Sequence, residues 1–207
     1  TDIPAANMQH AVEKVADRAH VNYGEAVNSV DGWRETLFEF LREREQHLLE
    51  RRGFETGEAK SVAEHWRDPE LALRCVDAVS QYRSSDDFKA LAGVFKRVKN
   101  ITKDFDGELD ATLKARLVEP AEIALVTELD TRLPLIDEAV GHERYADAMR
   151  QLGALSAPVD CFFVDVLVMA EDPMVRQARL ALLAALRRTI LTIADIAEIA
   201  PDDTQQA

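Results

Sequence analysis

The sequence predicts an all-α fold, a compact bundle of about seven to nine helices. Apolar residues recur at helical spacing over most of the 207 residues, and almost nothing alternates with the period of two that marks a strand. Prolines and glycines divide the chain at short intervals, and capping residues stand where the periodic segments begin. A 47% hydrophobic content is sufficient for a sizeable core without support from disulfides or metals.

The N-terminal third should hold a lead-in segment followed by an amphipathic helix. We expect an N-terminal helical extension over residues 1–31, with a weak helix at 5–20, and a helical domain over 32–207. A strongly amphipathic helix begins after Asp31 and stops at Gly53. The expected buried stripe of this helix is Leu37, Phe40, Leu41, Leu48 and Leu49.

Short helices should follow in the middle of the chain. A segment that starts at Thr56 must end before Pro69, because the residue preceding a proline is pushed out of helical geometry. Pro69 suits the first position of the next helix, which runs to Tyr82. The run Ser84-Ser-Asp-Asp is typical of an N-cap and predicts a helix from Phe88 to about Lys103.

Two further helix starts can be predicted from proline and acidic residues. Glu119-Pro120 begins a helix in which Pro134 introduces a kink. Asp172 before Pro173 is typical of an N-cap, and the last long helix is expected from Pro173 to about Ile199.

Charge and cysteine content narrow the class of protein. The net charge of −13 argues against a surface that binds polyanions over its whole area, so any nucleic-acid site must be local. Cys75 and Cys161 are too few and too far apart for a disulfide framework, which favours two buried thiols in a reducing, cytosolic setting. No run of eighteen apolar residues occurs, so we expect no membrane span.

The sequence lacks a recognisable catalytic or metal-binding motif. Its five histidines are scattered without a zinc-binding pair, and no glycine-rich phosphate loop is present. Acidic residues at 160, 165, 171 and 172 could act as paired carboxylates in acid/base catalysis, but the start of a helix explains Glu171 and Asp172 better. We therefore expect no catalytic residue and no metal ligand.

One basic stretch differs from this acidic background: Lys96, Arg97, Lys99 and Lys103. Three of these lysines and Asn100 fall at i, i+3, i+4 and i+7, and so should share a helical face while Phe95 and Val98 turn to the core. Such a face could hold phosphates, with Asn100 directed at a base edge, and Arg83 could join it. It could also suit an acidic protein partner.

Two segments resemble the C-terminal domain of the bacterial glycyl-tRNA synthetase β subunit. The first includes Phe95-Lys-Arg-Val-Lys-Asn-Ile101, and the second runs from Pro158 to Asp172 and on through Arg176-Gln-Ala-Arg179. With Glu119-Pro-Ala-Glu, the matches span about residues 37–199 in the family's order. Asp147-Ala-Met-Arg150 is similar to the DALR signature of this anticodon-binding fold.

The resemblance implies a helical, DALR-like anticodon-binding domain in the cytoplasm that supplies no catalytic residue. Its partners would be a glycine tRNA and the α subunit of a synthetase with two α and two β chains. ATP and magnesium would act on that separate catalytic subunit. The family's basic motif maps to Lys96, Arg97, Lys99 and Asn100, and its C-terminal motif to Arg176 and Arg179.

Two alternatives stay open at this point. A helical protein-interaction module could dock a partner subunit without contacting RNA, and an enzyme could use the acidic residues at 160–172. An aromatic and apolar run could stack on unpaired bases, but its helical spacing favours a scaffold in the core. The members of this run are Phe162, Phe163, Val166 and Met169.

Overall fold

In the part of the chain that the computed structural model describes, residue 14 and residues 33–199, every regular element is helical, which confirms the all-α prediction. The chain divides into two compact units, Thr1–Val76 and Asp77–Ala207. The extension predicted over 1–31 and its helix at 5–20 lie outside the described residues, apart from residue 14. Within those residues, no helix is both long and apolar enough to cross a membrane.

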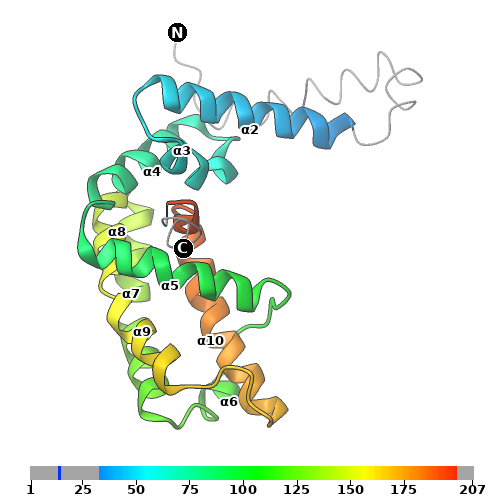
Figure 1. Ribbon diagram of the computed structural model, residues 1–207, viewed down its shortest axis with the longest axis vertical. Helices are drawn as coiled ribbons and strands as arrows, with labels where there is room; N and C mark the ends of the chain where they lie inside the picture. Colours follow the sequence, from blue (N-terminus) through cyan, green and yellow to red (C-terminus); the bar gives the residue numbers. More distant parts are fainter. Residues whose placement is uncertain (1–13, 15–32, 200–207) are drawn as a thin grey trace, which may run out of the picture. The chain divides into compact units, whose positions relative to one another are not determined.

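The helices of Figure 1 follow the chain from blue to red. The first unit contains α2 (Trp33–Arg51), α3 (Thr56–Ser61), the 3₁₀ turn η1 (Ala63–His65) and the start of α4 (Pro69–Tyr82). The second unit contains α5 (Asp86–Thr102), α6 (Ala111–Lys114), α7 (Pro120–Gly141), α8 (Tyr145–Gly153), α9 (Ser156–Asp165), α10 (Pro173–Leu191) and the 3₁₀ turn η2 (Ile196–Glu198).

In the first unit, the inward face of α2 differs from the predicted one. Leu49 is buried as predicted, but Phe40 and Leu48 are each 54% exposed, so that part of the predicted stripe is wrong. The face that packs within the unit carries Phe38, whose ring lies 5.0 Å from the ring of Trp66. Seven residues further on, about two turns of helix, the same face carries Glu45.

Glu45 is a buried carboxylate without a hydrogen-bond partner among the described residues, and only 8% of its surface is exposed. Burial, with a smaller contribution from the charge of Asp68, raises the pKa of Glu45 to about 7. Because the charged form is disfavoured in an apolar environment, a large fraction of this side chain is still protonated near neutral pH.

In the second unit, helix starts are set by the predicted side chains. The Ser85 hydroxyl accepts from the backbone N–H of Phe88 at 3.2 Å, and Asp172 accepts from that of Met174 at 2.8 Å. Glu119 and Glu122 form a capping box at the start of α7. These contacts satisfy N–H groups that have no partner inside their own helix.

Three further predictions need correction or refinement. Helix α10 ends at Leu191 instead of running to Ile199, and η2 follows as a separate turn. Pro134 lies inside a helix assigned continuously from Pro120 to Gly141. Cys75 is buried as predicted, but Cys161 is exposed.

The core of the second unit forms where α5 packs on α9 and α10, and where α7 packs on α8 and α9. Its largest fully buried side chains include Phe88, Phe95, Leu125, Ile136, Met149, Leu152, Phe162 and Leu182. This packing fixes the rotation of α5 about its own axis, which decides which of its side chains reach solvent.

Candidate nucleic-acid interface

The basic stretch lies on α5, which buries one face and exposes the other. Its buried residues recur at helical spacing: Phe88, Leu91, Ala92, Phe95, Val98 and Thr102. This confirms the inward orientation predicted for Phe95 and Val98. The exposed face carries Lys89, Gly93, Arg97 and Asn100, which we call the α5 outer face.

The structure separates Lys99 from this outer face. Its ammonium group pairs with the carboxylate of Asp195, the N-cap of η2, and lies 3.9 Å from the Oε1 of Glu198. The lysine is therefore directed toward the C-terminal turn, and two carboxylates of the same fold offset its charge. In the structure Lys99 thus contacts η2, whereas the adjacent Asn100 is exposed to solvent.

Arg97 is held in place by an aromatic ring of α9. The centre of its guanidinium lies 4.3 Å from the centroid of the Phe163 ring. Phe163 is only 8% exposed, so the ring acts as a fixed platform. A stacked guanidinium keeps its N–H groups at the edge of its plane, where they can donate to a phosphate.

The remaining predicted residues of this region differ in their surroundings. The side chain of Lys103 is 71% exposed and its ammonium lies 3.9 Å from Asp104. Lys96 is half-buried beside the outer face, and Arg83 is half-buried just after α4. Asn100 is exposed, and its side chain makes no hydrogen bond to another described residue.

Lys89 belongs to the same surface, although the sequence interpretation did not include it. It is exposed and its side chain forms no ion pair within the described part of the chain. It stands four residues before Gly93 and seven before Lys96, which places it on the same side of the helix. The spacing of four and seven residues was the available signal, but the uninterrupted basic run of the sequence begins only at Lys96.

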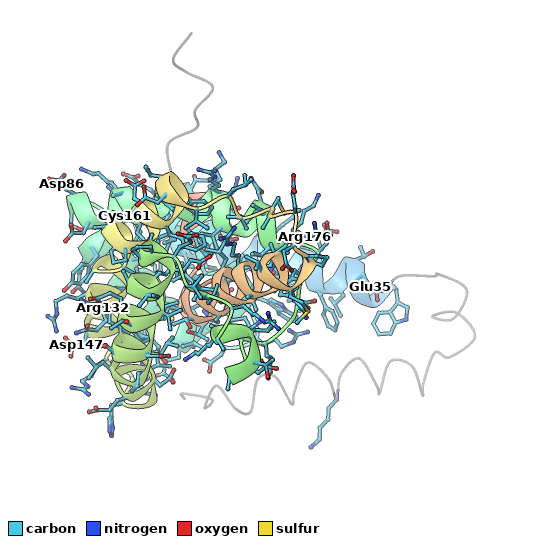
Figure 2. The ribbon with its side chains drawn as sticks, turned by 90° about the horizontal axis from the view of Figure 1, so that it is seen from below. Glu35, Asp86, Arg132, Asp147, Cys161 and Arg176 are labelled. Atoms are coloured by element: carbon cyan, nitrogen blue, oxygen red, sulfur yellow. The ribbon has the colours of Figure 1, made fainter. Side chains whose placement is uncertain are left out.

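The second predicted set, Arg176 and Arg179, makes its contacts on other elements of the fold. Figure 2 shows Arg176 and Asp86, the first residue of α5, on opposite sides of the view. The guanidinium of Arg176 donates to the Ala170 carbonyl at 3.2 Å. Arg179 is 12% exposed and pairs with the fully buried Glu122 at 2.6 Å. These contacts give both arginines a place in the fold that is independent of RNA.

The acidic residues at 160–172 form a helix start and a surface, not a cluster in a cleft. Asp160, Asp165 and Glu171 are exposed, and Asp172 is used as the N-cap of α10. A cleft of about 250 Å³ lies elsewhere, between α6, α7 and α10, with Lys114, Asp130 and Arg188 in its lining. Among the described residues, no three His, Cys, Asp or Glu side chains are placed to hold a metal ion.

The apolar run of α9 is largely core. Phe162, Phe163 and Val166 are buried as predicted, but the prediction is wrong for Met169, which is 55% exposed. Several neighbours of Met169 are also exposed: Val164, Leu167 and Met174. The stretch from the end of α9 to the start of α10 thus presents apolar side chains to solvent at a place far in sequence from the α5 outer face.

The described part of the second unit is all-helical and carries a local basic surface on an acidic molecule, an arrangement that nucleic-acid-binding domains use. Residues 92–203, more than half of the chain, match the family described as DALR anticodon binding domain. The chain belongs to this family. The match includes most of α5, from Ala92 onward, and every later helix.

Three curated relatives of the chain are each named glycine–tRNA ligase beta subunit. The chain is similar to the glycine–tRNA ligase beta subunit of Thiobacillus denitrificans, 37% identical over 79% of this chain and 24% of that protein. The beta subunit of Acinetobacter baumannii is 33% identical over 89% of this chain and 27% of that protein. The glycine–tRNA ligase beta subunit of Aromatoleum aromaticum is 37% identical over 79% of this chain and 24% of that protein. The chain therefore spans about a quarter of the length of these relatives.

Proposed function

We propose that the chain binds the anticodon arm of a glycine tRNA through the α5 outer face. Support comes from the family match, from the name of the relatives and from the local concentration of cations on a molecule of net charge −13. The observation that carries the proposal is the position of Lys89, Arg97 and Asn100 on one exposed side of a helix whose other side is core.

The expected mechanism divides the work between charge and hydrogen bonding. Lys89, Lys96, Arg97 and Lys103 would neutralise phosphates of the anticodon arm, with Arg83 beside them. Asn100 both donates and accepts, so it suits the edge of an unpaired base. Lys99, Arg176 and Arg179 remain predicted RNA contacts that this mechanism does not use; they contact Asp195, the Ala170 carbonyl and Glu122, respectively.

The acidic remainder of the molecule would repel RNA from other surfaces. A cationic face in a field of opposite sign favours encounters in one orientation and makes the association rate dependent on salt. The proposed effect of the net charge is therefore to reject unproductive encounters, and it does not require a second RNA site.

The wider context is part of the same proposal. The chain would belong to a glycine–tRNA ligase in the cytoplasm, in an assembly of two α and two β chains. The α subunit would use ATP and magnesium to attach glycine to the tRNA. This chain would contribute selection of the tRNA and no catalytic group.

A second function is favoured by a different surface. The exposed apolar side chains of Val164, Leu167 and Met169 are typical of a site that another protein covers. On this alternative the domain docks a partner subunit and RNA is bound elsewhere. Competition distinguishes the two, because unmodified tRNA should displace an RNA footprint but leave a subunit interface intact.

The first test is binding of the chain to a glycine tRNA transcript and to one with an altered anticodon, over a series of salt concentrations. The double variant Lys96→Ala/Arg97→Ala should bind the tRNA less tightly. The slope of its log affinity against log salt concentration should become shallower by the amount expected for about two lost phosphate contacts. The matched control is Lys60→Ala/Arg116→Ala, which removes two exposed cations outside α5 and should bind normally. Full-strength binding by the first variant would show that the site is misplaced.

The two transcripts address specificity. A preference for the natural anticodon would support anticodon recognition, whereas equal affinity would reduce the interaction to charge alone. Absence of any binding by the unaltered chain would overturn the proposal and favour the protein-interaction alternative.

A further inference from the structure

Gly93 is an unexpected residue in the interior of α5. It is the eighth of the seventeen residues of this helix, far from either cap, and it is exposed. Glycine destabilises a helix interior relative to alanine, because it loses more backbone freedom on folding. Gly93 does not have the positive φ that requires glycine in a turn or a cap.

Internal packing does not explain Gly93 either. A Cβ atom added at this position would meet no other atom of the described residues within 4 Å. By comparison, a Cβ at Gly153 on α8 would lie 3.7 Å from the Cβ of Asp87. Among the described residues nothing would therefore obstruct an alanine at residue 93, which should stabilise the helix, so packing gives no reason for the glycine.

The residues around Gly93 indicate what kind of group the open space above it could hold. Lys89 is four residues before it and Arg97 four residues after it, so each is about 6 Å away along the helix axis. Lys96 and Asn100 follow at three and seven residues. Gly93 is thus a gap in a row of donors, and the long side chains of Lys89 and Arg97 can both reach a group placed over it.

We propose that Gly93 is the point at which the RNA sugar–phosphate backbone approaches α5 most closely. Without a side chain at this position, a phosphate can rest on the helix surface between Lys89 and Arg97. Arg97 is pre-positioned for this contact by its stacking on Phe163. The inference rests on the proposed function and names a residue of the same site that selects the ligand by shape and not by charge.

Charge complementarity favours RNA as the occupant over an acidic protein. A phosphate is compact and lies on the outside of the nucleic-acid strand, so a gap of one side chain is sufficient to admit it. A carboxylate of a protein partner extends from its backbone on a flexible side chain and needs no such gap.

The test compares Gly93→Ala and Gly93→Leu with Gly141→Ala in the 207-residue chain. Gly141 is the last residue of α7, and a Cβ there also meets nothing within 4 Å, so it is a matched control. Gly93→Ala should raise the melting temperature by about 1–4 °C, which shows that the fold is intact. Its affinity for the glycine tRNA transcript should nevertheless fall.

Gly93→Leu should bind the transcript about tenfold less tightly, the loss expected for one charge-assisted hydrogen bond. Gly141→Ala should bind as tightly as the unaltered chain. Normal binding by Gly93→Leu, with weak binding by Lys96→Ala/Arg97→Ala, would overturn this inference and leave the proposed function standing. Normal binding by both variants would overturn both. If Gly93→Leu loses capture of a purified α subunit but keeps tRNA, the face docks protein and the inference is wrong.

Discussion

The Nε of Arg179 lies 2.6 Å from the Oε1 of Glu122, and the Glu122 side chain has no exposed surface. The other oxygen of Glu122 accepts from the backbone N–H of Glu119 at 2.8 Å. Arg179 also donates to the Leu167 carbonyl at 2.8 Å. One buried ion pair therefore joins the start of α7, the segment after α9 and the first half of α10.

Arg179→Ala should destabilise the second unit strongly. The substitution leaves the Glu122 carboxylate buried without its cation, which costs about 3–5 kcal/mol in comparable buried pairs. Urea unfolding followed by circular dichroism measures this loss. Arg176→Ala is the control, because this arginine donates to a single carbonyl and should cost much less. Weakened tRNA binding by Arg179→Ala at unchanged stability would instead identify a direct RNA contact.

Lys99→Ala should affect η2 more than RNA binding. The Lys99 side chain is 39% exposed, so its pair with Asp195 should contribute about 0.2–1 kcal/mol. A double-mutant cycle with Asp195→Ala measures this coupling. Lys99→Ala should lower the affinity for tRNA less than Lys89→Ala does, because no described residue offsets the charge of Lys89. A larger loss of tRNA affinity in Lys99→Ala than in Lys89→Ala would show that Lys99 is part of the RNA-binding surface.

Phe163→Leu should weaken tRNA binding through Arg97. The variant removes the ring under the guanidinium, a contact of about 0.5–1 kcal/mol at an exposed arginine. Phe162→Leu is the control, since Phe162 is fully buried and has no cation over it in the described structure. Both variants should lose stability, but only Phe163→Leu should lose affinity for tRNA at matched folded fraction. Equal affinities would show that the stacking of Arg97 is irrelevant to binding.

Glu45→Gln should stabilise the chain increasingly as the pH rises. The pKa of Glu45 is about 7 in the folded chain against the ordinary 4.5, so folding favours its protonated form. The stability it contributes is complete below about pH 4.5 and is lost as the pH rises through 7. Glutamine is neutral at every pH, so the free energy of unfolding of the variant should exceed that of the native chain by about 3 kcal/mol above pH 7.

Thermal unfolding of the two chains at pH 5, 6, 7 and 8 checks the prediction for Glu45. Glu43→Gln alters an exposed carboxylate of the same helix and should show no such trend. A difference between Glu45→Gln and the native chain that stays constant with pH would show that Glu45 is charged in the folded state.

Helix starts were the part of the fold that could be predicted from sequence. Ser85, Glu119 and Asp172 each act on backbone groups two or three residues away, so the information is local. Burial on α5 was also predictable, because the spacing of Phe95 and Val98 follows the helical period. The end of α10 was not, since nothing near Leu191 breaks the apolar pattern that continues into η2.

The candidate site was only partly predictable, because the partners that decide it are distant in sequence. Lys99 forms an ion pair with Asp195, which lies ninety-six residues later in the chain. Arg179 is taken by Glu122, fifty-seven residues earlier. Phe40 and Leu48 looked like core because α2 is apolar on two sides, and only packing selects the side that carries Phe38 and Leu49.

The last turn of α5 depends on a side chain from α10 for its hydrogen bonds. The Arg187 guanidinium donates to the carbonyls of Thr102 and Phe105, and to the Asp106 carboxylate at 3.0 Å. Eighty-five residues separate Arg187 from Thr102 in the chain, so this contact requires closure of a long loop. The C-terminal end of α5, with Lys103, should therefore become ordered late in folding, after α10 has docked. A nascent chain released before residue 187 is synthesised would lack this anchor, which couples completion of the basic surface to completion of the domain.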